Sequence, residues 1–268
     1  MIPQPIKVRW INPIGISDYD QAMATLISEI KSPTTEVELV SLAMKHSPLD
    51  LEYCTYEGLV TADTVKVTRD AAVNDFDGVV IGCFYDVALA ESREISGKAV
   101  VVAPCQASVM LATQLANKFS VIVGRRKWID QMESTIWNYG YQRELVSLRS
   151  IDMRVEEFQQ HPEKTRQRMF EQAELAIKND YAEAIILGCT IEFGFFQDLQ
   201  AALGVPVIDP VLAAFKTVEY LAGMKKQFQW QPSRVWGCEA PPEADLLAWK
   251  IFAEPAPIGN RIWIPKTE

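Results

Sequence analysis

Two cysteines occupy equivalent places in two similar stretches of the sequence. Cys83 follows the apolar run 78–82, Cys189 follows the apolar run 184–188, and a glycine stands directly before each cysteine. A cysteine between the end of a buried strand and the start of a helix lies where helical N–H groups stabilise a thiolate. A thiolate on one side of a small carbon acid can remove a proton, and a thiol on the other side can return one. The pair therefore indicates a racemase or epimerase.

Either cysteine alone would more simply be a small apolar residue in a strand core. A repeat in the sequence favours the catalytic interpretation. At a constant offset of 106, residues 38–42 recur unchanged as 144–148, residues 77–83 align with 183–189, and residues 101–104 align with 207–210. Three ungapped matches in the same order indicate two copies of one fold. Two copies related by a pseudo-twofold would set both thiols across one shared cleft.

Apolar runs of strand length alternate with helical stretches along the chain. Most of the runs are largely apolar rather than strictly alternating, as in parallel strands that are buried on both faces. We predict an α/β fold of two similar doubly wound parallel-sheet domains, with the active site in the cleft between them. The first domain comprises residues 1–105 and is completed by 211–268, including a closing helix that ends at Gly223; the second comprises 106–210. The expected strands are 7–12, 36–42, 78–84, 98–104, 119–124, 144–148, 183–189 and 205–210.

Composition narrows the possible functions. The formal net charge of −9 and the lack of a basic stripe argue against nucleic acid and anionic membranes as partners. No apolar stretch approaches the roughly 20 residues of a membrane helix, and no signal peptide is evident, so we expect a cytoplasmic protein. Five widely spaced cysteines fit free thiols. Metal-binding, phosphate-binding and dinucleotide-binding motifs are absent from the sequence, so we expect a small-molecule substrate and no cofactor.

Other polar side chains stand close to the two cysteines in sequence. Tyr85 and Asp86 follow Cys83 and could contact a substrate. The hydroxyl of Thr190, with the backbone N–H groups beside both cysteines, could hold the oxyanion of an enolate. Arg125 follows another strand end and could bind a carboxylate through two hydrogen bonds, although a solvated loop arginine is the commoner case.

The tail after residue 223 has no counterpart in the repeat. It holds four of the seven tryptophans, and large aromatic side chains such as these are usually buried rather than left in water. We expect the tail to cover the first half or to be buried against a second subunit, in a homo-oligomer. The four are Trp230, Trp236, Trp249 and Trp263.

Taken together, these residues resemble the aspartate, glutamate and hydantoin racemase superfamily, especially its hydantoin and allantoin racemase branch. The resemblance covers about residues 7–223, and the paired Gly-Cys motifs are its most specific part. The segments that carry it are Asn12-Pro13, Gly82-Cys83-Phe84, Gln106-Ala107, residues 119–123, residues 187–190 and residues 205–210.

The resemblance implies that Cys83 and Cys189 transfer the proton, and that Asn12, Gln106 and Thr190 line the substrate pocket. This chain departs from the branch in two places. Residues 84–88 replace a turn that contains Gly and Pro, and Gln106 replaces an acidic residue. We therefore expect the bulkier first loop, with Phe84, Tyr85 and Asp86, and the neutral amide of Gln106 to give the pocket a different shape and charge.

Two other functions stay open. The first is a cis-trans isomerase of the maleate type, in which one cysteine adds covalently to the alkene. The second is a non-catalytic module whose two lobes bind a small molecule. A decarboxylase of the arylmalonate type fits less well, because the resemblance implies a single cysteine, in the second half, for such enzymes.

Overall fold

The computed structural model describes residues 5–44 and 47–267, which form an α/β fold with two mainly parallel sheets. The internal contacts of the chain separate it into two compact units. Unit 1 comprises the described residues of Met1–Gly82, Val87–Ala103 and Phe215–Glu268. Unit 2 comprises Cys83–Asp86 and Pro104–Ala214. The predicted fold class is confirmed, whereas the predicted cleft and domain boundaries stay predictions.

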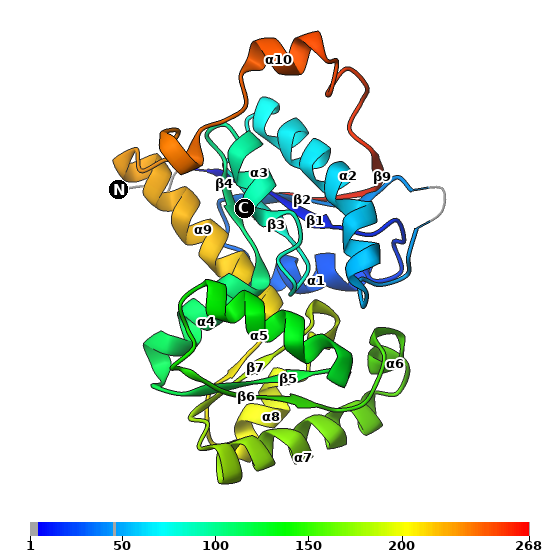
Figure 1. The fold of residues 1–268 in the computed structure, drawn as a ribbon, viewed down its shortest axis with the longest axis vertical. Helices are drawn as coiled ribbons and strands as arrows, with labels where there is room; N and C mark the ends of the chain where they lie inside the picture. Colours follow the sequence, from blue (N-terminus) through cyan, green and yellow to red (C-terminus); the bar gives the residue numbers. More distant parts are fainter. Residues whose placement is uncertain (1–4, 45–46, 268) are drawn as a thin grey trace. The chain divides into compact units, whose positions relative to one another are not determined.

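Unit 1 is built on one five-stranded sheet with helices packed on it (Figure 1). Its strands are β1 (Ile6–Asn12), β2 (Thr35–Leu42), β3 (Gly78–Ile81), β4 (Val100–Val102) and β9 (Ile258–Ile264). Its helices are α1 (Asp20–Ile30), α2 (Cys54–Val73), α3 (Leu89–Ile95), η3 (Trp236–Cys238), α10 (Glu243–Ala248) and most of α9 (Pro210–Phe228). The strand order is β4-β3-β1-β2-β9, in which only β9 is antiparallel to its neighbour. Right-handed crossovers therefore put α1 on one face of the sheet and α2 and α3 on the other.

Unit 2 is built on one four-stranded parallel sheet. Its strands are β5 (Phe119–Val123), β6 (Leu145–Ser150), β7 (Ala184–Leu187) and β8 (Val207–Ile208), in the order β6-β5-β7-β8. Its helices are α4 (Pro104–Leu115), η1 (Arg126–Trp128), α5 (Ile129–Asn138), α6 (Val155–Gln160), α7 (Pro162–Asp180), η2 (Thr190–Glu192) and α8 (Phe196–Leu203). All residues of β5 and β7 are buried, which fits runs that are apolar except at Ser120.

The two sheets repeat one topology. Read from the fourth strand of each copy, β4-β3-β1-β2 and β8-β7-β5-β6 have the same order. The register agrees as well, because Val80 pairs with Val102 and Ile186 pairs with Ile208, in each case at an offset of 106. Two of the three sequence matches, those that contain the cysteines and the prolines, are therefore structurally equivalent.

The third match, between residues 38–42 and 144–148, does not keep its register. Leu39 of β2 lies opposite Trp10 of β1, whereas Leu145 of β6 lies opposite Phe119, the first residue of β5. An irregularity between Phe119 and Ser120 shifts the pairing further. The identical pentapeptides occupy equivalent strands, but their residues are not equivalent one by one.

The tail completes unit 1 and differs from the expectation at two points. Helix α9 continues through Gly223 to Phe228, so the predicted end of the closing helix is wrong. The ammonium groups of Lys225 and Lys226 lie 3.0 and 2.8 Å from one carboxylate oxygen of Asp77, and these ion pairs support the extra turn. Beyond α10, the tail returns as β9 and pairs antiparallel with β2 (orange to red in Figure 1).

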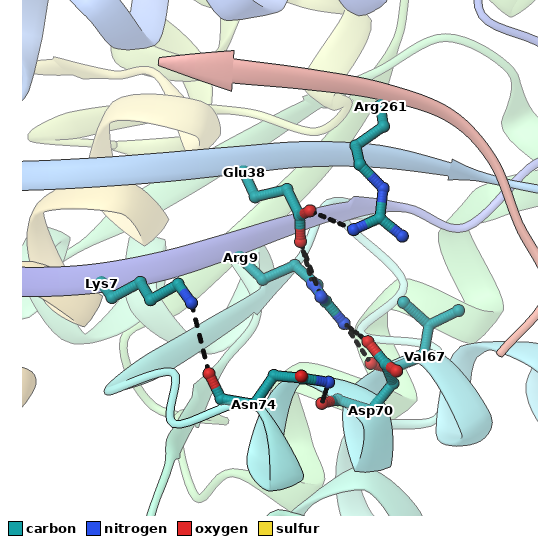
Figure 2. A network of polar contacts seen from close by, with 7 residues as sticks. All are labelled: Lys7, Arg9, Glu38, Val67, Asp70, Asn74 and Arg261. Carbon is teal, nitrogen blue, oxygen red and sulfur yellow. Dashed lines mark hydrogen bonds and ion pairs between the residues drawn. The ribbon is translucent and has the colours of Figure 1, made fainter. Parts of the chain in front are cut away.

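A buried ion-pair network fixes β9 to the sheet (Figure 2). The guanidinium of Arg9, only 1% exposed, donates to Glu38 at 2.7 Å and to Asp70 at 2.6 Å, and it also donates to the carbonyl of Val67 at 3.0 Å. The second oxygen of Glu38 accepts a hydrogen bond from Arg261 of β9. Because each charge has an opposite partner and directed hydrogen bonds, the network offsets the cost of burial.

The aromatic side chains of the tail are largely exposed within this chain. The exposed fractions are 68% for Trp230, 90% for Trp236, 69% for Trp249 and 48% for Trp263. Among the described residues, no helix is long and apolar enough to cross a lipid bilayer.

Candidate active site

A glycine that tolerates no side chain precedes each cysteine. The N–H of Gly82 donates to the carbonyl of Ile11 at 2.8 Å, and the N–H of Gly188 donates to the carbonyl of Ile122 at 2.7 Å. A Cβ atom at Gly82 would lie 2.6 Å from the indole of Trp10, and one at Gly188 would lie 2.6 Å from the Ile122 oxygen. The chain can thus leave both sheets in the same way only with glycine at these positions.

The first cysteine opens a short turn that belongs to unit 2. The N–H of Asp86 donates to the carbonyl of Cys83 at 3.0 Å, which closes the turn Cys83–Asp86. Asp86 has a φ of 55°, in the left-handed region that aspartate tolerates better than most residues. The thiol-bearing residue Cys83 is half-buried, whereas Phe84 is 3% and Tyr85 9% exposed.

The carboxylate of Asp86 ties this turn to helix α4. Its two oxygens accept hydrogen bonds from the N–H of Cys105 at 2.8 Å and from the N–H of Gln106 at 2.9 Å. A third donor is the hydroxyl of Tyr139, which follows α5, at 2.8 Å. First-turn N–H groups have no partner within their own helix, so a carboxylate here both caps α4 and interacts favourably with its dipole.

A third cysteine lies beside the first turn and is shielded from solvent. Cys105 is completely buried at the start of α4. Burial raises the pKa of its thiol well above the usual value, and the charges of Asp86 and Cys83 raise this pKa further. Cys105 therefore stays a protonated packing residue at neutral pH.

Aromatic packing holds the middle of the first turn. The ring of Tyr85 meets Trp128 edge to face, with 6.4 Å between ring centroids, and Trp128 meets Phe158 in the same manner at 6.2 Å. Trp128 is 2% exposed and Phe158 is fully buried. The turn is thus packed into unit 2 by its side chains as well as by the Asp86 hydrogen bonds.

The second cysteine opens an equivalent turn. The N–H of Glu192 donates to the carbonyl of Cys189 at 3.0 Å, and Cys189, like Cys83, is half-buried. Gln159 of α6 donates from its amide to the carbonyls of Ile191 at 2.8 Å and Phe193 at 3.2 Å, which clamps the segment from outside. Both half-buried thiols therefore belong to unit 2 and begin turns of the same form.

Two buried carboxyl groups accompany the second turn. Burial raises the pKa of the fully buried Glu192 well above its usual value; the N–H groups of Cys189 and Gly188 oppose this rise and the charge of Asp209 adds to it. Burial also raises the pKa of Asp209 to about 6, although one of its oxygens accepts the N–H of Val211 at 2.8 Å and caps α9. Both carboxyl groups of the second turn are therefore harder to ionise than an exposed acid.

Comparison with known proteins places the chain in a family. The family model described as Asp/Glu/Hydantoin racemase matches residues 8–218. The chain belongs to this family. It is 33% identical to a hydantoin racemase from Rhizobium meliloti over 66% of this chain and 73% of the relative. It is 31% identical to a hydantoin racemase from Pseudomonas sp. (strain NS671) over 72% and 77% of the two chains.

A solved structure extends the likeness to the fold. The allantoin racemase from Klebsiella pneumoniae superposes with a TM-score of 0.81 at 25% identity, and the match covers 88% of this chain and 94% of that chain. The predictions of the racemase family, of an isomerase and of the α/β fold are thus confirmed. Which residues of this racemase family member act on substrate stays a prediction.

The structure places the remaining predicted residues as follows. Gln106 and Arg125 are half-buried in unit 2, where Arg125 precedes η1, and Thr190 is 5% exposed at the start of η2. Asn12 ends β1 in unit 1, where its amide accepts from Trp10 at 2.8 Å and donates to Asp20 at 2.5 Å. Among residues 5–44 and 47–267, no group of three or more His, Cys, Asp or Glu side chains is arranged to hold a metal ion.

Two residues that hold the cysteine turns in place were not predicted from the sequence. Glu192 had a readable signal, because it stands 106 positions after Asp86, at the offset that relates the cysteines. Tyr139 had none, because it lies in no repeated segment and reaches Asp86 only through the packing of α5 beside α4.

Proposed function

We propose that this racemase family member inverts a small carbon acid, hydantoin-like or derived from an amino acid, by proton transfer between Cys83 and Cys189. The observation that carries the proposal is the equivalence of the two half-buried thiols, each directly after a glycine and each opening a turn of the same form. The hydantoin racemases among its relatives support the choice of substrate class.

In the proposed reaction, one cysteine acts as thiolate and removes the proton from the carbon next to a carbonyl group. The electrons of the broken C–H bond form an enolate, and the other cysteine delivers its thiol proton to the opposite face. The reverse reaction exchanges the two roles. Because only a proton is removed and a proton returned, no net oxidation or reduction occurs. Backbone N–H groups beside the cysteines and the hydroxyl of Thr190 stabilise the enolate oxygen.

The rest of the predicted site binds the substrate in this proposal. Asn12 and Gln106 offer amides to its polar edges, Arg125 interacts with a carboxylate where one is present, and Phe84 and Tyr85 shape the apolar wall. Asp86 belongs to the same set and is considered separately below. The cytoplasmic location and the homo-oligomer stay predictions. Light scattering on the purified chain would measure its oligomeric state.

The decisive experiment follows proton exchange and optical rotation together. Single enantiomers of 5-substituted hydantoins, allantoin and acidic amino acids are incubated in D₂O with the native protein, Cys83→Ser and Cys189→Ser. Each serine variant is expected to lose about 10²-fold or more of the racemisation rate, because each lacks a general acid or base. Cys238→Ser, at an exposed thiol of the tail, is the matched control and is expected to keep the native rate.

Two outcomes would contradict the proposal. If both serine variants turn over a substrate at nearly the native rate, the cysteines do not transfer the proton. If maleate gives fumarate while no carbon acid exchanges deuterium, the covalent mechanism of a cis-trans isomerase describes the chemistry better.

A further inference from the structure

Each cysteine turn is closed by a buried acidic residue at its fourth position. Asp86 donates its N–H to Cys83 and Glu192 donates its N–H to Cys189, each at 3.0 Å. The two acids are 106 positions apart, as are the two cysteines. Asp86 is 7% exposed and Glu192 is completely buried. The acid is therefore duplicated together with the thiol.

In the first copy, the acid holds its turn through a helix. The Asp86 carboxylate accepts hydrogen bonds from two N–H groups of α4 and from the hydroxyl of Tyr139, all between 2.8 and 2.9 Å. The turn cannot rotate without breaking these three bonds and the bond from its own N–H to Cys83. Hydrogen bonds to an ionised carboxylate contribute more than neutral ones, so the position of Cys83 is strongly constrained.

In the second copy, the cap of the corresponding helix comes from elsewhere. The strand register makes Ala103 equivalent to Asp209. Ala103 offers no side-chain acceptor, so α4 is capped by Asp86, whereas Asp209 caps α9 through the N–H of Val211. Glu192 is thereby released from capping.

The Glu192 carboxyl is nevertheless retained inside the protein. Neither of its oxygens has a hydrogen-bond partner of good geometry among the described residues. A fully buried acid without such a partner costs stability and calls for an explanation other than packing. Its place directly beneath the Cys189 turn provides one.

We propose that Asp86 and Glu192 are positioning residues, each of which holds the cysteine whose turn it closes. Asp86 acts through α4 and Tyr139, and Glu192 acts from within the core against the Cys189 turn. The catalytic meaning of this arrangement rests on the proposed two-cysteine function, but the effect on the thiols does not. Each acid should therefore affect its own cysteine and leave the other unchanged.

We call this expected result, in which each acid affects only its own cysteine, the cross-pattern. Alkylation of the thiols tests it without a substrate. Native protein, Asp86→Ala and Glu192→Gln are treated with iodoacetamide between pH 6 and 10, and the rate at each cysteine is read from its peptide by mass spectrometry. Asp86→Ala is expected to raise the rate at Cys83 by about fivefold or more, because the loosened turn exposes a half-buried thiol. The rate at Cys189 should stay within about twofold; Glu192→Gln should show the reverse pattern.

A matched control separates positioning from a general loss of stability. Glu183 also accepts two backbone N–H groups, from Asn117 at 2.6 Å and Lys118 at 3.3 Å, but it stands before β7 at the opposite end of the strand from Cys189. Glu183→Ala should therefore leave the rates at both cysteines unchanged. Tyr139→Phe removes one of the three donors to Asp86 and should give a smaller increase at Cys83 than Asp86→Ala.

Activity provides the second readout. On a substrate that the native protein racemises, Asp86→Ala should lower kcat by about 10²-fold with KM changed less than about threefold, and Asp86→Asn should restore part of it. Equal changes at both cysteines, or no change at either, would overturn the positioning role even if the serine variants lose racemisation. The cross-pattern without any racemisation would instead support positioning and refute the proposed function.

Discussion

The carboxyl group of Asp209 should make the stability of this protein fall as the pH rises. Burial raises its pKa from 3.8 to about 6, so the folded protein binds more protons than the unfolded chain between these two values. Proton binding to the folded state is lost as the pH rises through 6. The contribution of this group to the free energy of unfolding therefore decreases across the window and is constant above it.

The magnitude follows from the distance between the two pKa values. A difference from 3.8 to about 6 corresponds to about 3 kcal/mol. Asp209→Asn keeps a side-chain oxygen for the N–H of Val211 and removes the ionisation. The variant should match the native protein at pH 4 and exceed its unfolding free energy by up to about 3 kcal/mol at pH 7.5.

Urea unfolding followed by circular dichroism at several pH values between 4 and 7.5 measures this difference. Asp180→Asn is the control in the same unit. The hydrogen bond from Arg149 lowers the pKa of Asp180. The stability that this carboxylate contributes is therefore lost only as the pH falls below the window from 4 to 7.5. The difference between the native protein and Asp180→Asn should thus be flat from pH 4 to 7.5. A difference for Asp209→Asn that is equally flat would refute the assignment of the raised pKa.

Two further predictions concern the glycine before the second cysteine and the ion pairs that hold β9. Gly188→Ala should lower the unfolding free energy by about 1–3 kcal/mol, because its Cβ would lie 2.6 Å from a backbone oxygen; an unchanged urea midpoint would show that the strand end moves freely. Arg9→Ala should cost about 3–5 kcal/mol, because it leaves Glu38 and Asp70 without their buried partner. Arg261→Ala should cost clearly less, because Glu38 keeps Arg9; equal losses in urea unfolding would contradict the network in Figure 2.

The predicted strands agree with the structure where apolar burial alone decides the local structure. All eight expected runs contain a strand. The signal is clearest in β3 and β7, whose residues are all apolar and buried, as in parallel strands covered on both faces. The strand β9 escaped prediction since it pairs antiparallel at a sheet edge and its residues alternate between half-buried and exposed. The position of these residues between Pro257 and Pro265 was a usable signal, because prolines commonly stand at the two ends of an edge strand.

The error at the end of α9 has a different cause. A glycine near the end of a helical pattern is typical of a helix C-terminus. Inside a helix, however, it costs only about 1 kcal/mol, which two ion pairs can offset. The pairs of Lys225 and Lys226 with Asp77 join positions about 150 apart in sequence, so no local pattern could reveal them.

The repeat predicted the equivalence of the two strand ends better than it predicted individual contacts, and the acids show why. Duplication preserves what the backbone requires, so the glycines, the cysteines and the acids that close the two turns recur at one offset. It does not preserve which side chain satisfies the following helix, because one suitably placed carboxylate is enough. Once Asp209 caps α9, the acid of the second turn is freed, whereas Ala103 leaves that task to Asp86. Two turns closed by the same hydrogen bond are thus held in different ways, because Asp86 acts through α4 and Tyr139, whereas Glu192 lies fully buried against the Cys189 turn.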